Sequence, residues 1–219
     1  MSEVYSPPPS FQERAYFKNM EEYQEEYERS IKDPERFWAE KAEEFHWFKP
    51  WDTVCSYNYN MDEGPISIRW FDGGTTNIAY NCLDRHLASK GDQVAIIWEG
   101  NEPGEDSILT YRELHQQVCK FANVLKSRGV GKGDRVSIYL PMVPELAVAM
   151  LACARIGAVH SIVFGGFSAD ALGDRIVDAT CTTLITANGT HRGDKPIPMK
   201  PVADQAMATD DARMDQAVQ

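Results

Sequence analysis

The run from Arg135 to Ala187 constrains the fold more than any other stretch of the chain. Short apolar segments alternate there with two segments of helical character, which is the pattern of βαβ units in a parallel sheet. The predicted strands cover residues 136–140, 159–164 and 183–187. We therefore predict an α/β fold built on a partial, doubly wound parallel sheet.

The first predicted helix of this run covers residues 145–156. Pro144 suits the first turn of a helix, and Gly157 suits the position just after its end. Nearly every residue from 146 to 153 is apolar, so we expect other elements to cover this helix on more than one side.

A glycine pair, Gly165-Gly166, follows the second predicted strand. It lets the backbone turn tightly, and Ser168 is expected to cap the next helix. Ligands of open α/β sheets bind outside the carboxyl ends of the strands, where this turn should lie. The glycine pair alone leaves open whether the turn serves a ligand or only packing.

A small basic group follows the third predicted strand, in residues 188–196. Arg192 and Lys195 flank Gly193-Asp194 on a glycine-containing loop, where two cations can bind a phosphate by charge and hydrogen bonds. A pair at this spacing can equally be a solvated surface pair. Charge spacing leaves both interpretations open.

The region before the sheet is predicted to be a helical, aromatic-rich segment. Residues 1–15 contain three consecutive prolines and are expected to form a flexible, extended tail. Apolar residues then recur at helical spacing over 17–31, and Asp33-Pro34 should start a second helix. The aromatic residues of 45–51 are more typical of a buried seam than of a ligand cage.

The stretch between these regions contains further boundary signals. Residues 65–71 alternate as in a strand, and Thr76 or Asn77 should cap a helix that reaches Ala88. A strand is predicted over 93–98 and a polar loop after it. Thr110 and Glu113 then form a capping box that opens a helix ending near Gly129. From residue 93, strands and helices alternate, as expected for the sheet proposed above.

Composition excludes several classes of function. The formal net charge of −11 argues against non-specific binding to nucleic acid or to an anionic membrane. The five cysteines never form a CxxC pair, which indicates reduced thiols rather than a disulfide framework or a zinc site. The five histidines are far apart in the sequence and form no metal-ligand pattern. Without a signal peptide pattern or an apolar run of about 20 residues, the predicted location is the cytoplasm.

Five stretches, in this order, resemble the N-terminal part of the AMP-forming acetyl-CoA synthetases. They are FHWFKPW (45–51), NIAYNCLDRH (77–86), AIIWEG (95–100), LTYREL (109–114) and GAVHSIVFGGFS (157–168). The resemblance implies that residues 16–75 are the N-terminal segment of such an enzyme and residues 76–207 the first part of its adenylate-forming (AMP-binding) domain. Residues 208–219 leave the pattern and are expected to form a divergent polar tail.

The resemblance also implies a ligand site and a reaction. In these enzymes acetate and ATP give acetyl-adenylate, and the thiol of CoA then displaces AMP. The expected pocket for the adenine and 3′-phosphate of CoA is lined by Phe164, Gly165, Gly166, Arg192, Gly193, Asp194, Lys195 and Ile197.

No catalytic residue and no metal site is expected in this chain. ATP with Mg²⁺, acetate and CoA would be substrates of a complete enzyme, whose phosphate loop and acyl pocket would lie beyond residue 219. The chain alone is expected to be inactive and to need the remainder of the adenylate-forming domain as its partner. Two alternatives stay open: a non-catalytic module that binds CoA or a protein partner, and the front part of a related propionyl-CoA synthetase.

Overall fold

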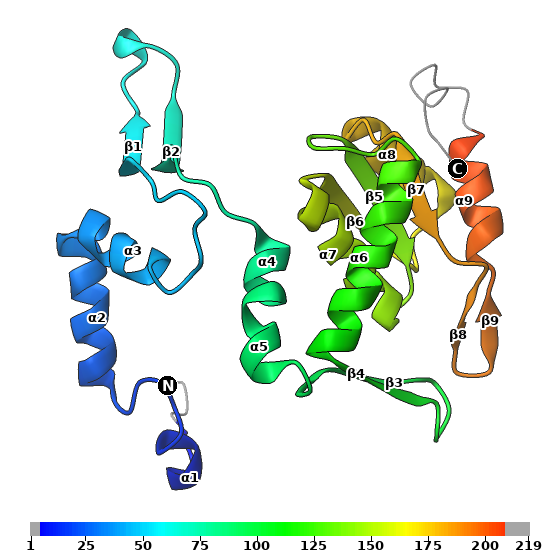
Figure 1. The fold of residues 1–219 in the computed structure, drawn as a ribbon, viewed down its shortest axis with the longest axis horizontal. Coiled ribbons are helices and arrows are strands. Elements are labelled where there is room, and N and C mark those ends of the chain that lie inside the picture. Colours follow the sequence, from blue (N-terminus) through cyan, green and yellow to red (C-terminus); the bar gives the residue numbers. More distant parts are fainter. Residues whose placement is uncertain (1–4, 209–219) are drawn as a thin grey trace. The chain divides into compact units, whose positions relative to one another are not determined.

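The computed structural model of the protein describes residues 5–208, and the chain divides into two compact units, Met1–Thr76 and Asn77–Gln219 (Figure 1). The prediction of a divergent tail over 208–219 falls, from residue 209 onward, outside the described residues.

Over residues 5–76, the first unit contains three α-helices, a 3₁₀ turn and one hairpin. Asn19 accepts a hydrogen bond from the backbone of Glu22 and begins the second helix, and Asp33 does the same for Arg36 at the start of the third. Both predicted helices are therefore present. Within the predicted extended tail, however, a short helix forms after Pro8. The elements are α1 (Pro9–Gln12), α2 (Met20–Lys32), α3 (Pro34–Ala42), β1 (Thr53–Asn58), η1 (Met61–Glu63) and β2 (Ser67–Asp72).

Aromatic rings join α3 to this hairpin. The Trp47 ring lies 5.0 Å from that of Trp51 and 5.4 Å from that of Phe71, and its Nε1 donates to the carbonyl oxygen of Ala42 at 2.9 Å. Trp47 and Trp51 thus pack against the hairpin inside the first unit. Phe45 and Phe48 are each 58% exposed, so only part of the predicted seam is buried there. The predicted strand at 65–71 is β2, which pairs with β1 in an antiparallel hairpin; β1 itself was not predicted.

The second unit is built on a three-stranded parallel sheet with the order β6-β5-β7. The predicted strands are confirmed as β5 (Arg135–Leu140), β6 (Val159–Phe164) and β7 (Thr183–Thr186). Successive residues of a strand point to opposite faces. Val136 and Ile138 accordingly pack into one apolar cluster with α6 (Tyr111–Ser127) and α7 (Pro144–Ile156), while Tyr139 packs into a second with α8 (Ala169–Asp178) and α9 (Met199–Met207). Helices therefore cover both faces, as in a doubly wound fold (Figure 1).

The predicted helix boundaries hold in this unit. Thr110 and Glu113 form the capping box at the start of α6. Gly157 ends α7 in the left-handed conformation (φ 76°), which a residue with a Cβ rarely adopts. The hydroxyl of Ser168 accepts from the backbone nitrogen of Ala171 at 3.3 Å and caps α8.

Two predictions for this unit are wrong in detail. The helix expected from residue 77 to 88 is broken at the buried Leu83 into α4 (Ile78–Cys82), the 3₁₀ turn η2 (Asp84–His86) and α5 (Leu87–Lys90). The strand expected at 93–98, β3 (Val94–Glu99), lies outside the parallel sheet. It pairs antiparallel with β4 (Asp106–Thr110), which forms from the second half of the predicted polar loop, because a short connection lets the chain fold straight back.

Within residues 5–208, no helix has both the length and the apolar character needed to cross a membrane.

Candidate functional site

The glycine turn lies at the carboxyl end of β6. The backbone nitrogen of Phe167 donates to the carbonyl oxygen of Phe164 at 3.0 Å and closes the turn. A Cβ on Gly165 would lie 3.3 Å from the carbonyl oxygen of Leu140, and one on Gly166 would lie 2.7 Å from the Phe164 ring. Close approach of neighbouring groups, rather than a left-handed backbone, therefore explains why glycines occupy this turn.

Aromatic side chains surround the turn. The buried Tyr139 lies below it, with its hydroxyl 3.1 Å from the carbonyl oxygen of Gly165 and 3.0 Å from that of Phe167, and burial raises the pKa of the Tyr139 hydroxyl. Phe164 is 68% exposed at the end of its strand. The turn thus presents bare backbone beside an exposed ring, a surface against which a planar group can stack.

The basic loop is a β-hairpin rather than an irregular loop. Its strands are β8 (Thr190–Arg192) and β9 (Lys195–Ile197), and the turn between them is Gly193-Asp194. Gly193 has a φ of 57°, which suits the first central position of such a tight turn. Arg192 and Lys195 are paired directly across the hairpin, so their two cationic side chains start from adjacent positions.

Both cations are exposed, and within residues 5–208 neither forms an ion pair with a carboxylate. Their charge is therefore available to an anionic ligand, since no internal partner competes for it. Asp194 sits between them at the tip of the hairpin.

The tip is fastened to another hairpin. The backbone nitrogen of Gly193 donates to Oδ1 of Asn101 at 3.0 Å, and Nδ2 of Asn101 donates to the carbonyl oxygen of Gly193 at 3.2 Å. Asn101 lies in the connection between β3 and β4, so two segments far apart in the sequence meet here.

The base of the hairpin is held against the sheet and α9. The carbonyl oxygen of Asn188 accepts from the backbone nitrogens of Met199 and Lys200, both at 3.1 Å. The Met199 side chain also reaches the glycine turn, where a Cβ on Gly165 would lie 3.2 Å from its methyl carbon. Met199 is thus the structural link between the two predicted parts of the site, the turn at 164–166 and the hairpin at 192–197.

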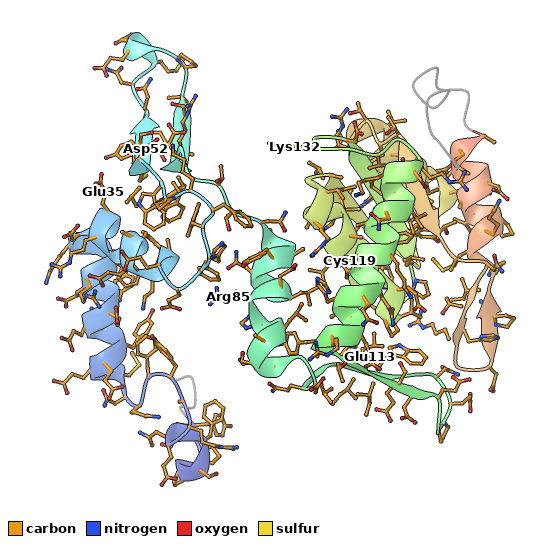
Figure 2. The ribbon with its side chains drawn as sticks, viewed as in Figure 1. Glu35, Asp52, Arg85, Glu113, Cys119 and Lys132 are labelled. Carbon is orange, nitrogen blue, oxygen red and sulfur yellow. The ribbon has the colours of Figure 1, made fainter. Side chains whose placement is uncertain are left out.

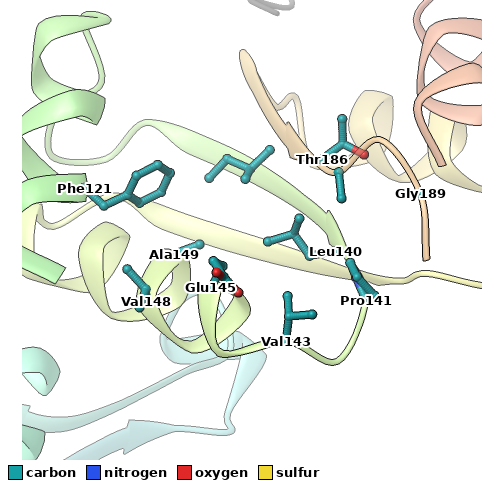
Figure 3. A pocket seen from close by; sticks show the side chains of 11 residues that line it. Phe121, Leu140, Pro141, Val143, Glu145, Val148, Ala149, Thr186 and Gly189 are labelled. Carbon is teal, nitrogen blue, oxygen red and sulfur yellow. The ribbon is translucent and has the colours of Figure 1, made fainter. Parts of the chain in front are cut away.

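A separate apolar pocket of about 420 Å³ opens at the carboxyl ends of β5 and β7 (Figure 3). Its lining is aliphatic or aromatic except for Glu145 and Thr186, and the Thr186 hydroxyl is buried without a hydrogen-bond partner within the part of the chain that the structure describes. None of the predicted ligand-binding residues lines it. No lysine, arginine or histidine of residues 5–208 lines the pocket, which is a poor setting for a phosphate.

One polar cluster of this unit was missed by sequence reasoning. Arg155 of α7 makes a bidentate ion pair with Asp84 of η2, and Nε2 of His115 on α6 lies 3.2 Å from the Asp84 carboxylate and 3.5 Å from the sulfur of Cys119. The Arg155 guanidinium holds the pKa of the Asp84 carboxyl below its usual value, and Asp84 in turn raises the pKa of Arg155. Figure 2 labels Cys119 on α6. His115 and Arg155 lie 31 and 71 residues from Asp84, so no local spacing could have revealed their contacts with this carboxylate.

This cluster fastens the 77–90 segment to the core. Its contacts are satisfied internally and its charges are paired, which is the arrangement of a structural ion pair rather than of a ligand site. In residues 5–208, no group of three or more potential metal ligands lies close enough together to hold a metal ion.

Comparison with known proteins gives matches over nearly the whole chain. The family described as AMP-binding enzyme matches residues 83–218, and the family described as acetyl-coenzyme A synthetase N-terminus matches residues 23–82.

Individual relatives agree with these families. The chain is 57% identical over 207 residues to an acetyl-coenzyme A synthetase of Halorhodospira halophila and 56% identical over 204 residues to one of Desulfatibacillum aliphaticivorans. It is 55% identical over 189 residues to acetyl-coenzyme A synthetase 2 of Pseudomonas putida. These alignments cover 94%, 93% and 86% of this chain but only 31%, 31% and 29% of the relatives, so the chain spans less than a third of their length.

Proposed function

Because the chain belongs to the AMP-binding enzyme family and is the N-terminal portion of an acetyl-CoA synthetase, we propose that it contributes the front of an AMP-forming acetate–CoA ligase. The substrates of the complete ligase are acetate, ATP with Mg²⁺, and CoA. The products are acetyl-CoA, AMP and diphosphate.

The proposed reaction has two steps. A carboxylate oxygen of acetate attacks the α-phosphorus of ATP, and diphosphate leaves. The sulfur of CoA then attacks the carbonyl carbon of acetyl-adenylate, and the bond to AMP breaks. The proposed binding residues act in the second step, because they hold the nucleotide end of CoA.

We assign the adenine and 3′-phosphate of CoA to the glycine turn and the basic hairpin. The proposed binding residues are Phe164, Gly165, Gly166, Arg192, Gly193, Asp194, Lys195 and Ile197. The observation that carries this assignment is the cross-strand pair of Arg192 and Lys195, two exposed cations without an internal ion-pair partner in the described residues. A phosphate between them would accept charge-assisted hydrogen bonds from both. The exposed Phe164 ring beside bare glycine backbone suits the adenine.

The proposed setting is the cytoplasm, with small molecules as ligands and the remainder of the adenylate-forming domain as the structural partner. The formal net charge of −11 argues against non-specific binding to nucleic acid.

The test is the substrate requirement of a complete ligase in which this chain is followed by the remainder of the adenylate-forming domain, here called the full-length polypeptide. It should form a thioester only with acetate, ATP and CoA together. It should exchange labelled diphosphate into ATP when acetate is present and CoA is left out. Thioester formation with propionate at equal efficiency would assign it to the propionyl-CoA synthetases instead. Binding of CoA without any exchange would favour a non-catalytic CoA-binding module.

A further inference from the structure

The carboxamide of Asn101 engages both polar backbone groups of a single residue, Gly193, at 3.0 and 3.2 Å. The two residues lie 92 positions apart, so this contact is made by the fold and not by local sequence. Gly193 is the first residue of the turn that separates Arg192 from Lys195. The two hydrogen bonds to Gly193 therefore restrain the backbone of the turn that joins Arg192 to Lys195.

Asn101 can restrain Gly193 because hydrogen bonds also restrain the β3–β4 loop in which Asn101 lies. The backbone nitrogen of Glu105 donates to the carbonyl oxygen of Glu102 at 3.0 Å, and the carboxylate of Glu105 accepts from the backbone nitrogen of Glu102 at 3.2 Å. The Asn101 amide also donates to the Glu102 carboxylate at 2.9 Å. Next to the carboxyl end of β3, the indole nitrogen of Trp98 donates to the carbonyl oxygen of Met142 at 2.7 Å. These contacts thus connect the β5–α7 connection, through the β3–β4 hairpin, to the tip of the basic hairpin.

The chemistry of the contact explains why an amide is used. The loop carries Glu102 and Glu105, yet the group that touches the basic hairpin is the neutral side chain of Asn101. A carboxylate there could accept from the Gly193 nitrogen but could not donate to its carbonyl oxygen, and it would place an anion beside the cations. The amide supplies one donor and one acceptor and leaves the charge of Arg192 and Lys195 available for a ligand.

We propose that Asn101 is a positioning residue for phosphate recognition: it fixes the tip of the β8–β9 hairpin so that Arg192 and Lys195 reach the 3′-phosphate of CoA together. The inference rests on the proposed function for the identity of the ligand. It adds the β3–β4 loop, which carries none of the assigned binding residues, to the machinery of the second half-reaction.

The test compares Asn101→Ala and Asn101→Asp with the parent in the full-length polypeptide. Gln117→Ala is the control, because it removes an exposed side-chain amide on α6 that lies outside the proposed site and its supporting loop. Three measurements are made: deuterium uptake of the peptide that covers residues 188–198, the KM values for CoA and dephospho-CoA, and acetate-dependent diphosphate exchange.

Loss of the two hydrogen bonds in Asn101→Ala should speed deuterium uptake and raise the KM for CoA about three- to tenfold. Asn101→Asp should raise it at least as much, because of the added anion. The KM for dephospho-CoA and the exchange rate should stay within about twofold of the parent in both variants, and Gln117→Ala should match the parent throughout.

Two failures can be told apart. If the parent prefers CoA over dephospho-CoA but Asn101→Ala retains that preference in full, Asn101 does not position the cations, and the proposed CoA site stands without it. If the parent uses both compounds equally, the phosphate assignment itself is wrong, and the inference falls with it even where deuterium uptake changes. Equal losses for both compounds and for exchange would show a general folding defect, which also contradicts a positioning role.

Discussion

The hydroxyl of Tyr139 lies 3.1 Å from the carbonyl oxygen of Gly165, which links the centre of the parallel sheet to the turn that we assign to CoA. The same hydroxyl lies 3.0 Å from the carbonyl oxygen of Phe167. One buried side chain on β5 thus restrains both sides of the glycine turn on β6. The turn is therefore a rigid part of the unit rather than a free loop.

Tyr139→Phe should weaken this restraint. The ring would still fill its site, but the two carbonyl oxygens would lose their shared donor, at a cost of about 1–2 kcal/mol in the free energy of unfolding. Urea unfolding monitored by circular dichroism measures the loss. Tyr57→Phe is the control, since Tyr57 is 67% exposed. A loss no larger for Tyr139→Phe than for Tyr57→Phe would contradict the hydrogen-bonding role.

The Asp84–Arg155 ion pair predicts a dependence of stability on pH. The native pKa of Asp84 is lowered, chiefly by its hydrogen bonds to Arg155, so the pair stabilises the fold fully above the unfolded carboxyl pKa of about 3.9. That stabilisation is lost as the pH falls through the lower native pKa.

Asp84→Asn should therefore cost about 1–3 kcal/mol at pH 7, and the difference from the parent should shrink as the pH falls below about 4. The exposed Asp92–Arg112 pair, at 3.1 Å, provides the comparison: Asp92→Asn should cost at most about 1 kcal/mol. Equal costs for the two variants at pH 7 would argue that Asp84 adds no more than a surface pair.

Backbone conformation predicts the effect of three glycine substitutions. Gly157 (φ 76°) and Gly129 (φ 87°) are left-handed, and Figure 2 labels Lys132, whose Cγ would lie 3.0 Å from a Cβ on Gly157. Alanine at either position should cost about 1–2 kcal/mol. Gly131→Ala should cost less than about 0.5 kcal/mol, because the nearest atom to its Cβ would be 3.8 Å away. Thermal unfolding of the three variants ranks them, and a Gly131 variant as unstable as the other two would refute this explanation.

The cysteines should differ in reactivity. Burial raises the pKa of the Cys153 thiol to about 11 and raises that of Cys181 as well, so both stay protonated and covered at pH 8. Cys82 is exposed. Brief treatment of the native chain with iodoacetamide, followed by peptide mass mapping, should find Cys82 alkylated and Cys153 and Cys181 intact. Early labelling of Cys153 would mean that α7 opens in the native state.

Local sequence signals predicted the core of the second unit well. The capping box at Thr110, the Pro144–Gly157 boundaries and the apolar strand at 159–164 each reflect interactions within a few residues, and the structure has them where they were expected. The family resemblance followed from the order of five short sequence stretches along the chain, and the comparisons agree with it.

Contacts between distant segments could not be predicted in this way. Nothing near β3 indicates that it leaves the parallel sheet to pair with β4, and nothing near Asn101 indicates that it meets Gly193. The Asp84–His115–Arg155 cluster likewise depends on how three segments pack. For the candidate site, the sequence indicated the residue types, whereas the cross-strand pairing of Arg192 with Lys195 required the structure.

Phosphate recognition by Arg192 is the central claim, and the second half-reaction tests it most directly. In the full-length polypeptide, Arg192→Ala should raise the KM for CoA by one to two orders of magnitude, roughly the value of a charge-assisted hydrogen bond. Acetate-dependent diphosphate exchange should stay close to that of the parent, because that step precedes CoA binding. Dephospho-CoA should be used about equally by the parent and the variant. An equal rise in the KM for CoA and in the KM for dephospho-CoA would contradict the claim. Arg192 would then be a solvated surface residue that does not bind the phosphate.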